Sequence, residues 1–114
     1  MNYLRHVDLE TMETSSTRFR QGLHDRDDGA SASKIYCVSL PPGGSSEGVH
    51  THAVEQCFYV IAGTLFVEID GQEYQAGPGT LVVTPAGTPH RNWNPGSERT
   101  TFLGIMELPE TAPG

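Results

Sequence analysis

Basic residues are scarce in this sequence. Its 114 residues include seven Lys and Arg against fourteen Asp and Glu, for a formal net charge of −7. Nucleic-acid binding requires a clustered excess of basic side chains that can neutralise phosphates. We therefore expect no nucleic-acid partner for this protein.

Long hydrophobic runs are also missing. No stretch of about 18 apolar residues is present to span a membrane, and the amino terminus lacks the basic and apolar segments of a signal peptide. The only two cysteines are Cys37 and Cys57. Without an export signal we expect both to be buried free thiols, because disulfides are rare in reducing compartments. These absences predict a cytoplasmic protein with no membrane association.

Turn-forming residues, in contrast, are abundant. The 13 Gly and 8 Pro separate short apolar runs rich in Val, Ile, Phe and Tyr, which predicts an all-β fold, and the length suits one domain. Asp70-Gly71 is a strong hairpin signal. We expect a peripheral strand at 17–23 and about eight further strands at 34–40, 49–53, 57–62, 64–69, 72–75, 80–84, 90–93 and 99–108.

The organisation predicted from these segments has three parts. Residues 1–33 form an N-terminal arm with the peripheral strand, because the stretch before residue 17 has no clear period and 24–33 is rich in Asp, Gly and Ser. Residues 34–108 form a jelly roll or related closed barrel. Residues 109–114 form a loose tail.

The first chemical signal is the pair His50 and His52. Side chains two apart in a strand point to the same face, so both imidazoles can converge on one ion. Without further context, the pair is as consistent with two ordinary surface histidines as with a metal site. His6 and His24 lie apart from it and are expected to be exposed.

A second pattern follows downstream. It consists of Gly79, Pro85, Gly87, His90 and Asn94, with an apolar strand before the proline and a turn before the histidine. Five such fixed positions are a poor match to chance in so short a chain, given average Gly and Pro usage.

With these residues the chain resembles the cupin superfamily. Its second motif, G-x5-P-x-G-x2-H-x3-N, is matched at every fixed position, and its first motif is matched by Gly44, His50, His52 and Gly63. The resemblance implies an all-β cupin double-stranded β-helix, or jelly-roll barrel, and a homodimer. It also implies one divalent transition metal, Mn, Fe, Ni, Zn or Cu, held by His50, His52 and His90.

The chain departs from the family pattern at the fourth ligand. Gln56 occupies the position of the usual glutamate, and the nearest carboxylate, Glu55, is one residue away. A shift of one residue in a strand turns a side chain to the opposite face, so Gln56 is the predicted ligand. Some cupins use such a set of three histidines and one glutamine. A neutral ligand shell leaves the ion its full charge, and thus a stronger Lewis acid that is bound less tightly.

Several residues are weaker candidates for a substrate pocket. Phe58 and Val60 share the inward parity of Gln56, although core packing is the simpler role for both, and Asn92 has the parity to face the pocket. Arg18 and Arg20 could hold an anionic substrate by bidentate contacts, although a solvated strand edge is the simpler interpretation.

The residues predict less about the reaction. Cys57 and Trp93 are expected to face away from the metal. The general base is a water activated by the metal, a histidine outside the motifs, or Glu107 on the last strand. The favoured hypothesis is Lewis-acid catalysis of lyase, isomerase or cyclase type on a small oxygen-bearing substrate. The alternatives are an Fe- or Ni-dependent dioxygenase and a cupin that binds a small ligand without turnover.

Overall fold

The computed structural model describes residues 2–46 and 48–108. Within them the elements are α1 (Leu9–Thr14), β1 (Phe19–His24), the 3-10 helix η1 (Arg26–Asp28), β2 (Ser33–Leu40), β3 (Gln56–Ala62), β4 (Leu65–Ile69), β5 (Gln72–Ala76), β6 (Leu81–Thr84), β7 (His90–Trp93) and β8 (Thr100–Glu107). The tail expected at 109–114 lies outside the described residues.

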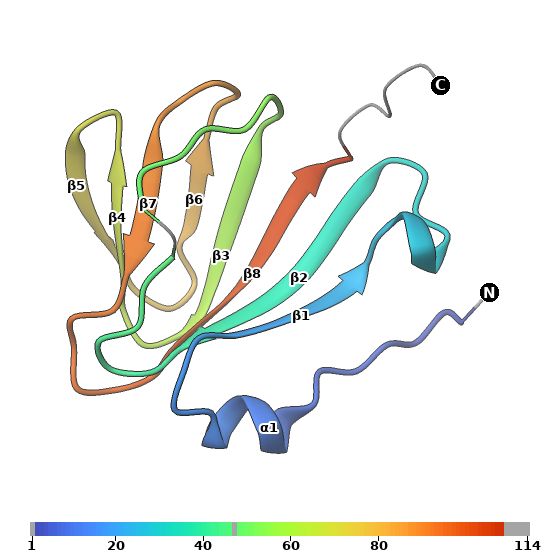
Figure 1. The fold of residues 1–114 in the computed structure, drawn as a ribbon, viewed down its shortest axis with the longest axis horizontal. Coiled ribbons are helices and arrows are strands. Elements are labelled where there is room, and N and C mark those ends of the chain that lie inside the picture. Colours follow the sequence, from blue (N-terminus) through green and yellow to red (C-terminus); the bar gives the residue numbers. More distant parts are fainter. Residues whose placement is uncertain (1, 47, 109–114) are drawn as a thin grey trace.

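The strands form two antiparallel sheets, which confirms the all-β prediction (Figure 1). The larger sheet has the order β1-β2-β8-β3-β6, and the smaller sheet has the order β5-β4-β7. Consecutive strands such as β3 and β4 alternate between the sheets, as they do in a jelly roll. The expected peripheral strand is β1, at the edge of the larger sheet.

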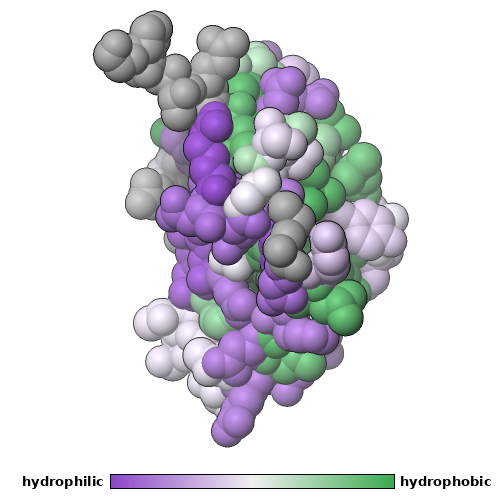
Figure 2. All heavy atoms as spheres, turned by 90° about the vertical axis from the view of Figure 1, so that its right-hand side faces the viewer, coloured by the Kyte–Doolittle hydropathy of each residue, from purple (hydrophilic) through white to green (hydrophobic). Residues whose placement is uncertain are grey.

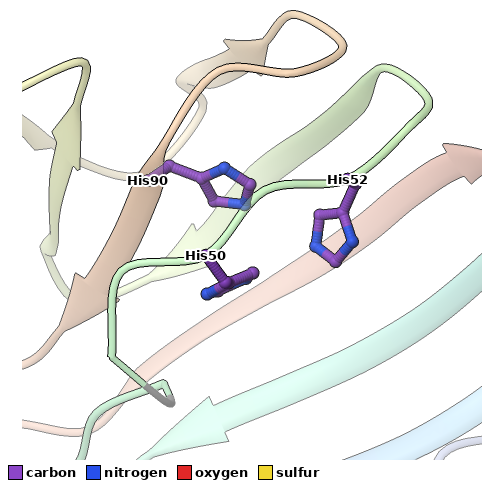
Figure 3. A group of neighbouring side chains, drawn as sticks. All are labelled: His50, His52 and His90. Atoms are coloured by element: carbon purple, nitrogen blue, oxygen red, sulfur yellow. The ribbon is translucent and has the colours of Figure 1, made fainter.

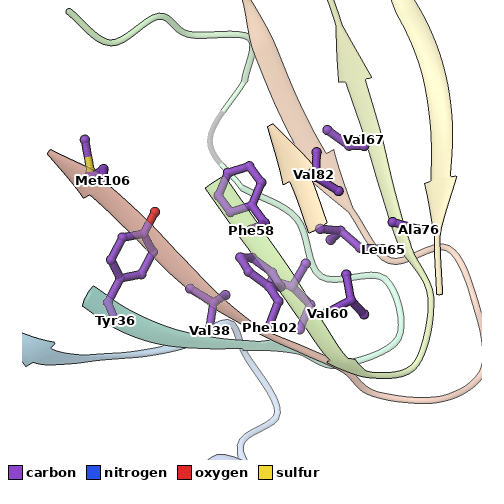
Figure 4. Packing of buried hydrophobic residues seen from close by; sticks show 11 residues of the cluster. Tyr36, Val38, Phe58, Val60, Leu65, Val67, Ala76, Val82, Phe102 and Met106 are labelled. Carbon is purple, nitrogen blue, oxygen red and sulfur yellow. The ribbon is translucent and has the colours of Figure 1, made fainter. Parts of the chain in front are cut away.

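The hydrophobic core lies between the two sheets. Along β3 the inward residues Gln56, Phe58 and Val60 are buried, while Cys57, Tyr59 and Ile61 are more exposed, as the period of two predicts. Figure 4 shows the buried cluster extending from Tyr36 and Met106 at one end to Leu65, Val67 and Ala76 at the other. The candidate site lies at the end that contains Tyr36.

The N-terminal arm covers the outer face of β2. Asp8 caps the helix α1, which the aperiodic sequence did not predict, and Met12 of this helix packs against Cys37 with its sulfur 3.9 Å away. Both faces of β2 are therefore buried from Tyr36 onward. Cys37 and Cys57 are free thiols as expected, but Cys57 is only half-buried, because it faces outward where no helix covers it.

The predicted hairpin turn is present, but one of the predicted strands is not. Asp70 and Gly71 both have positive φ, at 51° and 82°, and join β4 to β5 as expected. The strand expected at 49–53 is wrong, since only an isolated bridge forms there, between His50 and His90. The ladder stops because the next carbonyl, that of His52, accepts from Gly87 in a turn instead of from a strand.

Figure 2 views the molecule from the side of β1 and the chain ends. Hydrophilic side chains cover the middle of this face, and hydrophobic ones gather along its right-hand edge. In the described part of the chain, no helix has the length and apolar character needed to cross a membrane.

Candidate metal centre

Three histidines converge beside the core (Figure 3). His50 and His52 lie on the connection between β2 and β3, and His90 begins β7. Their candidate ligand atoms lie within 4.8 Å of one another. The ring centroids are 4.5 Å apart for His50 and His90 and 4.9 Å for His50 and His52. This spacing allows one ion to contact all three rings.

Backbone hydrogen bonds, not a strand, bring the histidines together. His50 and His90 exchange reciprocal N–H···O bonds of 3.0 and 2.9 Å, which place the two residues directly opposite each other. The His52 carbonyl accepts from the N–H of Gly87 at 2.8 Å. Gly87 has a φ of 76°, a conformation that glycine adopts without steric cost. The second motif thus anchors both histidines of the first.

Backbone carbonyls also orient two of the rings. His50 Nδ1 donates to the Gly48 carbonyl at 2.8 Å, and His90 Nδ1 donates to the Thr88 carbonyl at 2.9 Å. A carbonyl can only accept, so Nδ1 carries the proton and Nε2 presents its lone pair. Second contacts of this kind fix the tautomer of metal-binding histidines.

The environment favours the neutral form of His52 and His90. Burial lowers the pKa of His90, and the positive charge that His50 would carry lowers it further, against the opposing effect of the Thr88 carbonyl. Burial is also the main cause of the lowered pKa of His52, followed by the charges of His50 and His90. Neutral imidazole is the form that binds metals.

Gln56 places its amide against this group. The side chain is buried, and its Oε1 lies 2.9 Å from His90 Nε2. Its Nε2 donates to the Tyr36 hydroxyl and lies 4.0 Å from the sulfur of Met106. The strand parity of Gln56 therefore directs it to the site as predicted, whereas Glu55 is exposed and lines a different recess.

The contact between Gln56 Oε1 and His90 Nε2 fits a cation. With Nδ1 protonated, His90 Nε2 and Gln56 Oε1 are two lone-pair atoms 2.9 Å apart, and they repel each other. Two ligands at about 2.1 Å from one ion have a comparable separation, so a bound cation would turn this repulsion into attraction. The opposite amide orientation would point Nε2 at His90 instead, and replacement of Gln56 distinguishes the two orientations.

Tyr36 holds the amide in place because Gly104 leaves it room. Gly104 lies opposite Tyr36 on β8, and the Tyr36 ring covers it so closely that a Cβ there would overlap the ring and hydroxyl. Burial raises the Tyr36 pKa, so the hydroxyl stays protonated at neutral pH.

We predict that Gly104→Ala displaces Tyr36. The added methyl group should cost about 1–3 kcal/mol of unfolding free energy, as overpacking does in other cores, and should weaken metal binding because Gln56 loses its partner. Gly22→Ala in β1 is the matched control, since its Cβ would meet nothing within 4 Å. Urea unfolding and metal titration of both variants test this. Equal stability of the two variants would contradict the proposed packing.

A cavity of about 370 Å³ opens in front of His50 and His52. Apolar side chains of Val38, Phe58, Phe102 and Met106 form part of its wall, and Ser46, His50, His52, Gln56 and Asn92 contribute polar groups. Arg18, Arg20, Lys34 and Tyr36 complete the lining. The cavity is large enough for a small organic molecule.

The structure brings most of the predicted pocket residues together. Phe58, Asn92, Arg18 and Arg20 line the cavity. Val60 does not line the cavity. It has the same parity as Phe58 but lies two residues further along β3, where it is fully buried in the core.

Cys57 and Trp93 face away from the centre as expected, and Glu107, the candidate base, also lies away from it. Glu107 is exposed and lines a separate outer recess with Glu55 and Cys57, because the strand parity that turns Met106 inward turns Glu107 outward. It is therefore corrected as a candidate base. Trp93 packs on Phe66 of the neighbouring strand, with 6.0 Å between ring centroids.

Sequence analysis did not assign six of the lining residues to the cavity, among them Lys34, Tyr36 and Met106. The signal was present for Lys34 and Tyr36, since they share the inward parity of Val38 on β2. Met106 could not be assigned, because the pairing of β8 between β2 and β3 is a tertiary feature.

The last motif residue, Asn94, is structural. Its buried amide donates to the carbonyls of Leu40 and Glu98 at 3.0 and 2.7 Å and accepts from the N–H of Gly96 at 3.0 Å. It closes the turn after β7 and contributes no ligand.

Fold and site together define the class: a small jelly-roll barrel with a histidine group suited to a metal ion. A family model described as a cupin domain matches residues 36–106. The match covers more than half of the chain, and the protein belongs to the cupin family. The resemblance noted in the sequence motifs is confirmed.

Solved structures share the fold. The polyketide cyclase RemF from Streptomyces resistomycificus is 25% identical with a TM-score of 0.74, over 82% of this chain and 67% of its own. KdgF from a Halomonas species is 18% identical with a TM-score of 0.76, over 96% of each chain. A predicted oxalate decarboxylase from Thermotoga maritima is 23% identical with a TM-score of 0.72, over 81% of each chain. No functionally curated protein matches the sequence at a significant level.

Proposed function

We propose that the protein is a metal-dependent enzyme that acts by Lewis-acid catalysis on a small oxygen-bearing substrate, in a reaction of lyase, isomerase or cyclase type. The observation that carries this proposal is the neutral donor set: the candidate ligand nitrogens of three imidazoles lie within 4.8 Å of one another, and Gln56 Oε1 lies 2.9 Å from His90 Nε2. A divalent transition metal held there supplies an electrophile that polarises a carbonyl, hydroxyl or carboxylate oxygen. Imidazole-rich sites suit Mn, Fe, Ni, Zn or Cu.

The chain's own residues supply the rest of the chemistry. The Tyr36 hydroxyl lines the cavity and accepts from Gln56, which leaves its own proton available for a substrate oxygen. Because burial raises its pKa, the Tyr36 hydroxyl stays protonated at neutral pH and can donate a hydrogen bond to that oxygen. Phe58 and Phe102, 5.2 Å apart at their centroids, form an apolar wall that excludes water from the reacting group.

One relative supports the non-redox assignment. RemF is described as a polyketide cyclase, and at 25% identity it shares more sequence with this chain than the other two structures do. The others support the fold alone. No Asp or Glu of the described residues lines the cavity.

Metal substitution tests the reaction type. Metal-free protein is reconstituted with Zn²⁺ or Fe²⁺ and assayed against small carbonyl and hydroxyl compounds, with and without oxygen. Lewis-acid catalysis predicts turnover with redox-inert zinc that persists without oxygen. Turnover that requires iron and consumes oxygen would identify a dioxygenase instead. Binding without turnover under every condition would support the ligand-binding alternative.

We also propose a homodimer formed through the outer face of the larger sheet. Tyr59, Ile61, Leu81, Val83 and Ile105 are exposed there, on the adjacent strands β3, β6 and β8. Burial of such an apolar patch favours association. Light scattering should show a dimer at micromolar concentration for the parent and for Tyr74→Lys on the other sheet, and a monomer for Tyr59→Lys. A monomeric parent protein would contradict the proposal.

A further inference from the structure

Positive charge is concentrated in the cavity of an otherwise acidic protein. Three of the seven Lys and Arg residues, Arg18, Arg20 and Lys34, line it, although the chain carries a formal charge of −7. None of the acidic residues in the described part of the chain is among the lining. The lining of the cavity thus has the opposite charge to the protein as a whole, which favours an anionic ligand.

The two arginines face the cavity because of the pairing of β1. Arg20 lies opposite Val38, and Gly22 lies opposite Tyr36. Val38 and Tyr36 point inward, so Arg20 does too, and Arg18 has the same parity. The Arg20 guanidinium lies over the Tyr36 ring, 4.3 Å from its centroid.

The arginine charges are not neutralised within the described structure. Lys34 pairs with Asp25 at 3.5 Å, and the other ion pair joins Arg91 to Glu68 in the smaller sheet. Among the described residues no carboxylate lies within salt-bridge distance of Arg18 or Arg20. Within residues 2–46 and 48–108, the two guanidinium groups beside the candidate metal centre therefore form no ion pair, and only the more distant charge of Asp25 acts on Arg20.

We infer that the substrate carries a carboxylate, which Arg18 and Arg20 bind while another oxygen of the same molecule faces His50, His52 and His90. This inference rests on the proposed function. The planar guanidinium fork matches the two oxygens of a carboxylate, and contact with the Tyr36 ring fixes the plane of Arg20. The substrate class is thus a small organic acid with a second oxygen function.

The sheet sets the size of this acid. Arg20, Val38, Phe102 and Val60 lie in one row across β1, β2, β8 and β3, three strand spacings apart, which is about 14 Å between the outer backbones. Side chains project into this span from both ends. A molecule with a few bonds between carboxylate and metal-facing oxygen bridges it and fits in about 370 Å³.

A pair of matched probes tests the inference on zinc-loaded protein. Succinic acid monohydroxamate has a metal-binding hydroxamate and a carboxylate, and its amide counterpart replaces the carboxylate with a neutral group of similar shape. Calorimetry should show the acid binding roughly 10- to 100-fold more tightly, the range expected for charge-assisted hydrogen bonds. Arg18→Gln/Arg20→Gln should abolish this difference and leave the affinity of the amide unchanged. Arg26→Gln, which removes one charge in η1 outside the cavity, should preserve the difference in affinity between acid and amide.

The outcomes separate this inference from the proposed function. Equal binding of acid and amide to zinc-loaded parent protein would overturn the carboxylate assignment and leave the metal site intact. If the protein holds no zinc, the proposed function fails, and succinate binding to metal-free protein becomes the test. Succinate binding that Arg18→Gln/Arg20→Gln abolishes would still support the carboxylate site. Tighter binding of inorganic phosphate than of succinate would overturn it.

Discussion

Removal of any one of the three histidines should abolish most metal binding. We expect purified parent protein to hold one divalent ion per chain and His50→Ala, His52→Ala or His90→Ala to lose most of it, because each loses a quarter of a four-ligand set. The loss of metal affinity should exceed the roughly 10- to 100-fold loss that is typical when an outer-shell partner of a ligand is changed. Elemental analysis after desalting measures it, and turnover should fall in parallel.

The folded state must be checked in the same variants. His90 is buried, so circular dichroism and thermal melting of each metal-free variant should accompany the metal assay. His6→Ala is the matched control, since His6 is exposed and lies outside the site. A folded His50→Ala/His52→Ala double variant with full metal content would disprove the assigned centre.

Replacement of Gln56 should separate metal affinity from reactivity. Gln56→Glu keeps the shape of the side chain and adds a negative charge next to His90, so metal binding should tighten. The same charge lowers the Lewis acidity of the ion. Turnover at full metal loading should therefore fall by about tenfold or more, equal to about 1.4 kcal/mol of barrier. Metal titration and steady-state kinetics on the same preparation measure both effects.

Gln56→Ala provides the opposite change at this position. It removes the amide oxygen, so metal binding should weaken while the histidines still hold a partly occupied site. It also leaves the Tyr36 hydroxyl without its partner, so Tyr36→Phe, which keeps Gln56 but removes that hydrogen bond, is the control for the lost contact. If Gln56→Glu and Gln56→Ala both match the parent in metal content and turnover, Gln56 is not a ligand and its amide has the opposite orientation.

Much of the site was predictable from local spacing. The two motifs specify the residues His50, His52 and His90, and strand parity assigned Gln56 and Phe58 to the inside. Parity works here because side chains alternate strictly along β3. The same argument failed for His50 and His52, which converge through bonds to His90 and Gly87 without a strand between them.

Strand parity did not predict how deep each residue lies in the fold or which residues surround it. Val60 and Phe58 have the same parity, but only Phe58 reaches the cavity, because exposure depends on how far each lies from the end of the core. Glu107 was assigned to the wrong side because the register of β8 was unknown. Helix α1 escaped notice because six residues are too few to show a helical period.

The amino-acid sequence alone specifies the family, the all-β fold and the residues of the candidate metal centre, because these depend on short motifs and on a period of two. The surroundings of that centre, in contrast, follow from the tertiary structure. The pairing of β1, β2, β8 and β3 places Arg20, Tyr36 and Gln56, which are far apart in the chain, around one cavity. Such contacts arise from strand order and register, which no local pattern encodes.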